Sequence, residues 1–397
     1  MSEARYAAFF FPQAGALWRD PAFRALVFQA ILLLALLALI TMIVLNTMAN
    51  LESRGITTGF GFLNERAGFS IPQTLIDYSG DSTYARTFVV GLLNTLLVSI
   101  MGIIAATIIG FAVGIARLST NWLLAKLAAA FVETFRNIPL LVQILFWYFA
   151  VLQALPSPRQ SLSVFDTFFS NVRGLVMPDP QPLPGFAATP WALLAAIVIT
   201  IALAVFARRR QARTGKALPI YWLGTATIIG VPLAIFLVTG MPLEWSVPEL
   251  TGFNFRGGVT IIPEFMALWL ALSIYTASFI AEIVRSGIQS VPHGQVEAAN
   301  SLSLPGSITL RKVVIPQAMR VIVPQLTSQY LNLIKNSSLA TAIGYPDLVA
   351  VFAGTALNQT GQAIEIVAMT MAVYLIISLL VSALMNIYNA RTLLKER

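Results

Sequence analysis

The chain has 397 residues, of which 57% are hydrophobic and only 11% are charged, and its mean hydropathy is +0.78. Soluble domains carry about a quarter of their residues as charges, so this composition indicates a multi-span membrane protein. The net charge of +8 comes from basic residues in short segments between apolar runs, which is typical of topology signals rather than of nucleic-acid binding. The absence of cysteine and the single histidine, His293, argue against disulfides and against a metal centre held by this chain.

Eight apolar runs are long enough to cross a bilayer, because a spanning helix needs about 20 mostly apolar residues. They are residues 25–46, 87–116, 127–155, 191–207, 220–240, 263–283, 318–343 and 366–390. The first run has 22 residues without a charge, which is too long for the core of a cleaved signal peptide and predicts a retained span. The expected fold class is therefore an all-α polytopic membrane protein with about eight transmembrane helices.

Three longer segments between these runs are expected to lie outside the membrane. Residues 47–86 are rich in Gly, Ser, Thr and Asn, which predicts either a folded extramembrane piece or one that lies on the membrane surface. Residues 156–190 contain seven prolines and predict a mostly irregular loop. Residues 241–262 predict a further loop between the fifth and sixth spans.

The basic residues are distributed unequally between the two sides of the membrane. If the N-terminus lies in the cytoplasm, 17 of the 25 Lys and Arg fall on the cytoplasmic side and six on the other, with Arg136 and Lys335 inside spans. The longer outer segments carry fewer basic residues, so the asymmetry is not an effect of length. This pattern places both termini in the cytoplasm, together with residues 292–316.

Residues 292–316 form the longest polar-rich interruption of the C-terminal half. Pro292 and Gly294 mark its start, and good helix formers follow. Val296, Ala299 and Ser303 fall on one side of the predicted helix. A short exposed helix with small residues on one side suits insertion into a groove on a partner protein. An ordinary amphipathic loop helix is the alternative interpretation.

Charged residues inside the third span are candidates for a transport site. Glu133 and Arg136 are three residues apart, so they share a helix face and can pair, and Pro139 should bend or break the helix just beyond them. A broken, charged helix near the middle of the membrane is typical of a transport site. A Glu–Arg pair that fixes helix packing is the alternative.

Two further polar groups stand at the ends of spans. Glu282 and Arg285 are three residues apart at the cytoplasmic end of the sixth span, which predicts a pair that anchors the helix end. Lys335, followed by Asn336 and Ser337, interrupts the seventh span, and either snorkelling to the outer surface or contact with a substrate carboxylate would explain it. The chain has no phosphate loop, no G-x-S-x-G and no H-E-x-x-H, so no enzyme activity is expected and any ATP must be hydrolysed by another chain.

Several stretches resemble one known family. Glu297-Ala298-Ala299, Ser303 at a position where glycine is expected, and V-V-I-P ending at Pro316 are similar to the cytoplasmic signature loop of ABC importer permeases. The stretches that resemble the histidine/glutamine/arginine-type branch are E-T-F-R-N-I-P-L-L-V-Q (133–143), A-E-I-V-R-S-G-I-Q-S-V-P-H-G-Q (281–295) and L-I-K-N-S-S-L-A-T-A-I-G-Y-P-D-L (333–348). The first span, N-L-E-S-R-G-I-T-T-G-F-G-F-L-N and L-P-S-P-R-Q-S-L-S extend the resemblance over nearly the whole chain, to permease subunits of proteobacterial general L-amino-acid importers (Aap/Bzt type).

This resemblance implies a type I ABC importer permease fold and a subunit that translocates L-amino acids across the bacterial inner membrane. Residues 1–85 would form a cytoplasmic segment, the first transmembrane helix and a periplasmic segment, residues 86–390 the permease domain, and residues 391–397 a cytoplasmic tail. The implied partners are a homologous second permease subunit, a periplasmic amino-acid-binding protein and a cytoplasmic ATPase dimer, which would hold ATP and Mg²⁺, with no cofactor in this chain. The helix that docks into the ATPase would comprise Gly294, Glu297, Ala298, Ala299, Ser303 and Pro316.

An amino acid needs a cation for its carboxylate and an acceptor for its ammonium group, in a site shielded from water. Arg136 or Lys335 could supply the cation, and Glu133 or Glu282 the acceptor, unless the sister subunit carries the site. The expected substrate path comprises Glu133, Arg136, Gln143, Glu282, Lys335, Asn336 and Ser337. An ion-coupled secondary transporter is the alternative function, although Glu133 is the one carboxylate that lies deep enough in a span to bind its coupling ion. A membrane enzyme or an assembly protein is a third class, for which the chain offers no catalytic constellation.

Overall fold

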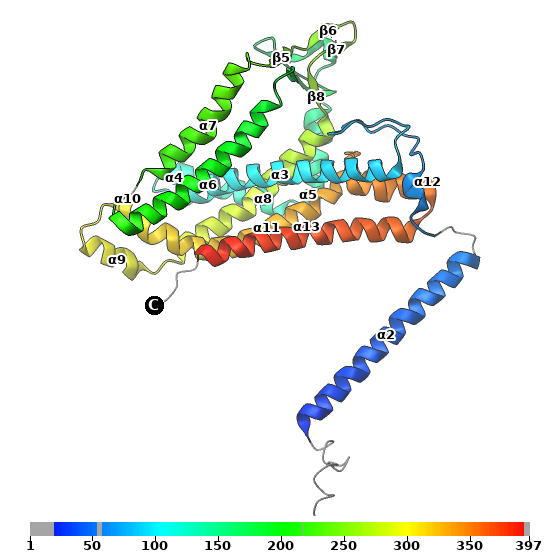
Figure 1. Cartoon of the computed structure of the whole chain (residues 1–397), viewed down its shortest axis with the longest axis horizontal. Coiled ribbons are helices and arrows are strands. Elements are labelled where there is room, and N and C mark those ends of the chain that lie inside the picture. Colours follow the sequence, from blue (N-terminus) through cyan, green and yellow to red (C-terminus); the bar gives the residue numbers. More distant parts are fainter. Residues whose placement is uncertain (1–19, 54–57, 217, 393–397) are drawn as a thin grey trace, which may run out of the picture.

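The computed structural model describes residues 20–53, 58–216 and 218–392, so both termini that the sequence places in the cytoplasm lie outside the described residues. Four long helices form a central bundle (Figure 1). They are α3 (Tyr84–Ala116), α8 (Pro263–Gln289), α11 (Ile315–Asn336) and α13 (Ala363–Thr392). The remaining helical elements are α2 (Pro21–Ser53), η2 (Gly61–Asn64), α4 (Trp122–Asn137), α5 (Leu140–Leu145), η3 (Phe146–Leu152), η4 (Pro158–Gln160), α6 (Ala188–Thr214), α7 (Ile220–Val238), α9 (His293–Ser301), α10 (Gly306–Thr309), η5 (Leu310–Val314), η6 (Ser337–Ile343), η7 (Val349–Ala356) and α12 (Leu357–Thr360).

Within the described residues, six helices are long and apolar enough to cross a membrane: α2, α3, α6, α7, α8 and α13. The pair formed by α4 with α5 and η3 makes a seventh span if the bent pair is counted as one. The remaining apolar run, residues 318–343, lies mostly in α11, which is 22 residues long and less apolar because glutamine, asparagine and serine interrupt it. The helical membrane fold expected from the sequence is confirmed.

Glycine lets α3 and α8 approach closely enough to form the most extensive helix contact of the bundle. A Cβ atom on Gly110 would lie 2.6 Å from Cβ of Ile280, and one on Gly114 would lie 2.7 Å from the carbonyl oxygen of Ala281. Lipid offers no hydrophobic drive for helices to associate, so packing through small residues four apart must supply it. The pair Gly110 and Gly114 therefore fixes where α8 crosses α3.

The break predicted at Pro139 is present. Helix α4 ends at Asn137 and α5 begins at Leu140, and the two segments meet at a bend of 104°. The buried Gln143 braces this bend, because its Nε2 donates to the carbonyl oxygens of Phe135 and Ile138, both at 2.9 Å. Backbone groups freed by a break must find other partners inside a membrane, and this side chain satisfies two of them.

The two long outer loops are more regular than the sequence predicted. They contain β1 (Leu162–Val164), β2 (Phe168–Asn171), β3 (Gly174–Met177), β4 (Asp179–Pro182), β5 (Leu243–Ser246), β6 (Glu249–Thr251), β7 (Asn254–Arg256) and β8 (Val259–Ile261). The antiparallel order β1-β2-β3-β8 and the pair β4-β5 join the two loops, with Leu175 opposite Ile261 and Pro182 opposite Leu243. Each of these two sheets therefore contains strands from both loops. We call this region, residues 162–182 and 243–261, the β-cap.

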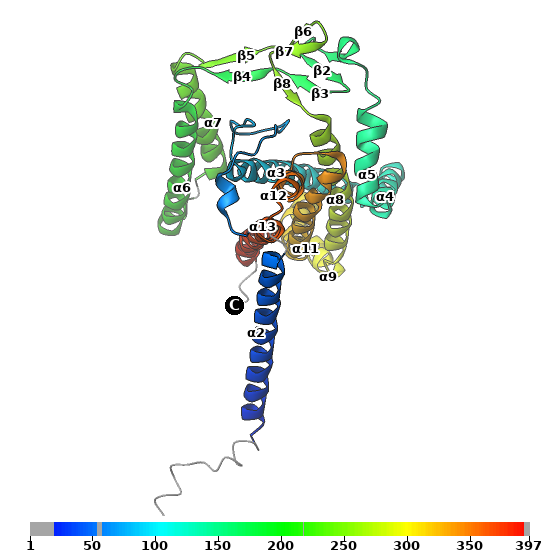
Figure 2. The ribbon, with the colours of Figure 1, turned by 90° about the vertical axis from the view of Figure 1, so that its right-hand side faces the viewer.

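The two-loop pairing also fixes the topology of this part of the chain. Helices α6 and α7 lie between the paired loops and form a hairpin whose two outer ends meet the β-cap. Figure 2 shows the β-cap at the top of the molecule. In Figure 1, α8 runs from β8 of the β-cap at one end to α9 at the other, so the length of α8 separates the β-cap from α9.

Residues 58–83, which we call the outer strap, pack on the bundle instead of lying free. Phe62 is buried between Tyr84 and Phe352, with ring centroids 6.0 and 6.1 Å away. The backbone N–H of Gly59 donates to Oε1 of Glu365 at 2.5 Å, which ties the strap to the first turn of α13. This segment is therefore folded against the bundle.

Candidate functional site

Helix α9 is a short surface helix that connects α8 to α11 through compact turns. It begins after Pro292 and runs from His293 to Ser301, within the segment where the sequence predicts a short helix. The backbone N–H of Ser303 donates to the carbonyl of Asn300 at 2.8 Å, and that of Leu304 to the carbonyl of Ala299 at 3.2 Å. These two bonds form a Schellman motif, which ends a helix and requires a left-handed residue after it.

Ser303 is that left-handed residue, with φ of +56°. A side chain costs about 1–2 kcal/mol in this conformation, whereas glycine adopts it freely. The glycine expected at this position is thus explained by the backbone angle. The serine of this chain keeps the turn at an energetic cost.

The predicted docking residues do not all face outward. Gly294, Glu297, Ala298, Ser303 and Pro316 are exposed, whereas Ala299 is only 4% exposed and points into the chain. The prediction that the small residues Val296, Ala299 and Ser303 form one exposed side is therefore wrong, because the chain itself covers Ala299. The outward surface combines Glu297 with the 74% exposed Leu302. We call the exposed residues Gly294, Glu297, Ala298, Leu302 and Ser303 the docking face.

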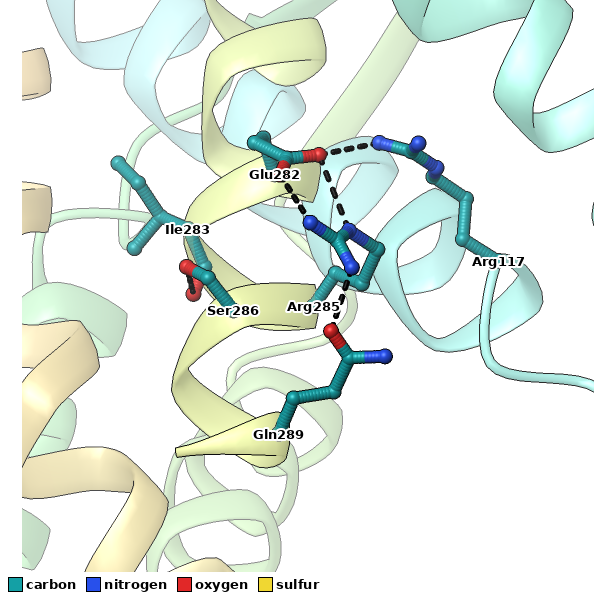
Figure 3. Close-up of polar contacts among 6 residues, drawn as sticks. All are labelled: Arg117, Glu282, Ile283, Arg285, Ser286 and Gln289. Atoms are coloured by element: carbon teal, nitrogen blue, oxygen red, sulfur yellow. Dashed lines mark hydrogen bonds and ion pairs between the residues drawn. The ribbon is translucent and has the colours of Figure 1, made fainter. Parts of the chain in front are cut away.

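Two turns before the end of α8, Glu282 holds two arginines (Figure 3). Nη2 of Arg285 lies 2.5 Å from Oε1 of Glu282, which confirms the predicted pair, and Nε of Arg285 donates to Oε2 at 3.2 Å. Nη1 of Arg117, at the end of α3, also pairs with Oε2 of Glu282. Nη1 of Arg285 also donates to Oε1 of Gln289 at 2.5 Å. With both oxygens engaged by guanidinium groups, Glu282 is committed to fastening α3 to α8.

Arg136 does not pair with Glu133, contrary to the prediction. Both side chains are exposed, and no ion pair between them is found in the described part of the chain. The guanidinium carbon of Arg136 instead lies 5.1 Å from the ring centroid of Phe279 on α8. A cation over an aromatic face gains electrostatic stabilisation without a carboxylate. Because Phe279 lies on another helix, sequence spacing alone could not reveal this contact.

A polar cavity of about 360 Å³ opens between the end of α4, the C-terminal part of α8 and the middle of α11. Its lining comprises Arg136, Phe279, Glu282, Ile283, Ser286, Gln325, Ser328 and Gln329. Pockets that bind small molecules begin at about 300 Å³. The cavity therefore offers a cation, two amides and two hydroxyls in a space large enough for a small polar solute.

The other expected substrate-path residues lie elsewhere. Lys335 lines a different cavity of about 500 Å³ between α11 and α13, together with Ser338, Thr370 and Tyr374. Ser337 is fully buried and donates to the carbonyl oxygen of Ile334 at 2.7 Å. Neither Glu133, Gln143 nor Asn336 lines either cavity. The structure thus brings Arg136 and Glu282 together and separates Lys335 from them.

Sequence reasoning missed the α11 wall of the polar cavity. Ser328 and Gln329 stand three and four residues after Gln325, which places all of them on one helix face. That polar stripe was available as a signal. The contribution of Arg117 was not, because 165 positions separate it from Glu282 in the sequence.

A buried carboxyl was also missed. Asp347 lies between α11 and α13, outside the helices long and apolar enough to span a membrane, and is fully buried. Its Oδ1 accepts from the backbone N–H of Ala350 at 2.8 Å, and the hydroxyl of Tyr374 donates to Oδ2 at 3.4 Å. Burial raises the pKa of Asp347 to about 7. The carboxyl fastens the start of η7 to α13.

Comparisons of the sequence with known proteins show one family. Residues 209–393 match the family described as "Binding-protein-dependent transport system inner membrane component". The chain is 57% identical to YhdX of Escherichia coli (strain K12), which is named as an amino-acid ABC transporter permease, over 95% of this chain and 96% of that protein. It is 53% identical to the general L-amino acid transport system permease protein AapQ of Rhizobium johnstonii, over 95% of this chain and 94% of that protein. A solved amino acid ABC transporter with histidines matches at 21% identity with a TM-score of 0.45, over 78% of this chain and 95% of that chain.

Proposed function

The chain belongs to the family of amino-acid ABC transporter permeases, and we propose that it carries L-amino acids across the bacterial inner membrane under the control of a separate ATPase. Residues 86–390 would be the permease domain, and both termini would lie in the cytoplasm. The partners would be a homologous permease subunit, a periplasmic amino-acid-binding protein and a cytoplasmic ATPase dimer that holds ATP and Mg²⁺. AapQ belongs to a general L-amino acid transport system, which supports amino acids as the cargo.

The docking face of α9 is the observation that carries this proposal. It combines an exposed carboxylate with an exposed leucine on a helix whose C-terminal turn is closed by two backbone hydrogen bonds, at the opposite end of α8 from the β-cap. An acidic group beside an apolar anchor suits a groove with a basic rim, and charge across such a contact fixes orientation. Closure of an ATPase dimer would displace α9, and through it α8 and α11.

The polar cavity offers a binding site for the amino acid on its way through this subunit. Arg136 would bind the carboxylate of the amino acid, because a guanidinium group donates two parallel hydrogen bonds to a carboxylate. Gln325 and Gln329 would accept from the ammonium group through their carbonyl oxygens. Glu282 would hold the cavity wall in place instead of binding the ammonium group.

Coupling through α9 can be tested by charge reversal in the assembled transporter. We expect Glu297→Lys to reduce the stimulation of ATP hydrolysis by loaded binding protein at least about tenfold, which corresponds to about 1.4 kcal/mol. The reason is that a cation would meet a basic groove, where like charges repel. The measurement is ATPase activity in vesicles that contain all presumed subunits.

Glu249→Lys is the matched control, because Glu249 is also exposed but lies in β6 of the β-cap. It should leave the stimulation within twofold of the wild type, a change of roughly 0.4 kcal/mol. Unchanged stimulation in Glu297→Lys would remove α9 from the coupling contact. Uptake that continues without any ATPase subunit would instead establish an ion-coupled secondary transporter.

A further inference from the structure

Helices α6 and α7 form a hairpin that stands apart from the central bundle. They pack extensively on each other, and their outer ends meet the β-cap (Figure 1). Their surface is strongly apolar and aromatic, and Tyr221 at the start of α7 is 86% exposed. The basic end of the hairpin lies at the same end of the molecule as α9.

A cavity of about 510 Å³ lies between α6 and α7 near this end. Residues from α6, from α7 and from the turn that joins them line it, so the hairpin builds it alone. Polar atoms come from Thr200, Arg208, Gln211 and Thr225, and apolar surface comes from Ala204 and Ile228. On α6, the lining residues recur at spacings of three and four, so one face of the helix forms one wall.

The charged residues around this cavity are all basic. Arg208, Arg209, Arg210, Arg213 and Lys216 place five cations within nine residues, and no Asp or Glu occurs from residue 180 to residue 243. Within the ranges that the structure describes, none of these cations forms an ion pair. Topology alone would account for basic residues at this end, but not for an arginine that lines a cavity with an apolar wall.

We propose that this cavity binds an anionic phospholipid. The phosphodiester would accept hydrogen bonds from Arg208 and Gln211, and an acyl chain would lie along Ala204 and Ile228. Basic pockets between transmembrane helices on the cytoplasmic side suit anionic headgroups, and a guanidinium binds phosphate with two parallel hydrogen bonds. A free phosphate ion shares the headgroup chemistry but has nothing to place against the apolar wall.

Native mass spectrometry of the full-length protein in detergent tests the site, with phosphatidylglycerol and phosphatidylcholine as probes. The wild type should hold phosphatidylglycerol at least about tenfold more tightly, because phosphatidylcholine has the same phosphodiester but also a quaternary ammonium that the cations around the cavity would repel. Arg208→Gln should remove most of this preference. Ala204→Trp should also remove it, because it fills the cavity without a change in charge.

Two controls separate a cavity from a diffuse attraction between charges. Ala202→Trp and Arg209→Gln make the same chemical changes at positions of α6 that do not line the cavity. They should retain the preference. Equal losses in Arg208→Gln and Arg209→Gln, with none in Ala204→Trp, would overturn the site in favour of a general surface charge.

Two further outcomes would also overturn the proposal. The first is equal binding of phosphatidylcholine and phosphatidylglycerol by the wild type. The second is displacement of phosphatidylglycerol by inorganic phosphate, which would identify a site for a free anion. None of these measurements involves ATP or an amino acid, so the result does not depend on the proposed transport function.

Discussion

Helices α2 and α8 are both expected to lie in the membrane, yet they differ in a way that reverses the rule for soluble proteins. Among the six apolar helices of the described chain, α2 is the most apolar and its apolar window is 0% buried, whereas α8 is the least apolar and 67% of its window is buried. In water the most apolar surface would be the most buried. In lipid, a large aliphatic side chain gains nothing by leaving the solvent.

The buried face of α8 shows what replaces hydrophobicity. It is rich in small residues, namely Ala267, Ala271, Ser273, Ala277, Ser278, Ala281 and Gly287. Across from it, α3 presents Gly110 and Gly114. Close backbone approach and many weak contacts therefore hold the bundle, while the aliphatic residues of α2 and of the α6–α7 hairpin face outward. Hydropathy identifies the membrane spans, and small residues identify the spans that pack closely against other helices.

The largest effect should come from a glycine in the bundle. Gly114→Ile should lower the free energy of unfolding by about 3 kcal/mol or more, because its Cβ would overlap the carbonyl oxygen of Ala281. The same substitution at Gly230 of α7, which has no atom within 4 Å of its would-be Cβ, should change it by less than about 0.5 kcal/mol. Thermal unfolding of the purified variants measures both. Equal losses would remove the contrast between bundle and hairpin.

An intermediate effect should come from the ion pairs. Glu282→Gln should lower the free energy of unfolding by about 2 kcal/mol, because it leaves Arg117 and Arg285 partly buried without a carboxylate. Asp81→Asn removes the partner of Arg66 on the exposed outer strap, and should cost at most about 1 kcal/mol. The comparison uses the shift in unfolding temperature at low and high salt. A larger loss for Asp81→Asn would contradict the role of Glu282 as a fastening between helices.

The smallest effect lies on the surface, in the turn after α9. Ser303→Gly should stabilise the turn by about 1 kcal/mol, since glycine adopts the left-handed conformation without strain. Ser301→Gly, two residues earlier and inside the helix, should destabilise it by a similar amount, about 0.5–1 kcal/mol. Hydrogen exchange of the α9 backbone amides reports both changes. Changes of the same sign would show that the Schellman turn does not control the end of α9.

Much of the membrane fold could be predicted because length, hydropathy and proline act locally. The apolar runs, the bend at Pro139 and the separate helix α9 each depend on neighbouring residues in the sequence. The strands of the β-cap could not be found this way, because β4 has its partner in β5 more than 60 residues later, beyond two helices. The prolines suggested irregular chain, although Pro180 and Pro182 lie within β4.

The candidate site was predicted in part for the same reason. Glu282 with Arg285 is a local pair within α8 and is confirmed. The pair of Glu133 with Arg136 failed, because the side chain of Arg136 finds Phe279 on another helix. Spacing on one helix shows which residues can meet, but the neighbouring helix decides which of them do.

The short connection between α8 and α9 has a mechanical consequence. Three residues join the end of α8 to α9, and backbone hydrogen bonds from Ser290 and Val291 extend back into α8. On the other side, four residues, 302–305, join α9 to α10, and α10, η5 and α11 follow one another without a break from Gly306 to Asn336. A movement of α9 would therefore reach both the α8 wall and the α11 wall of the polar cavity through short connections. A single contact at α9 would thus act on the cavity from both sides at once.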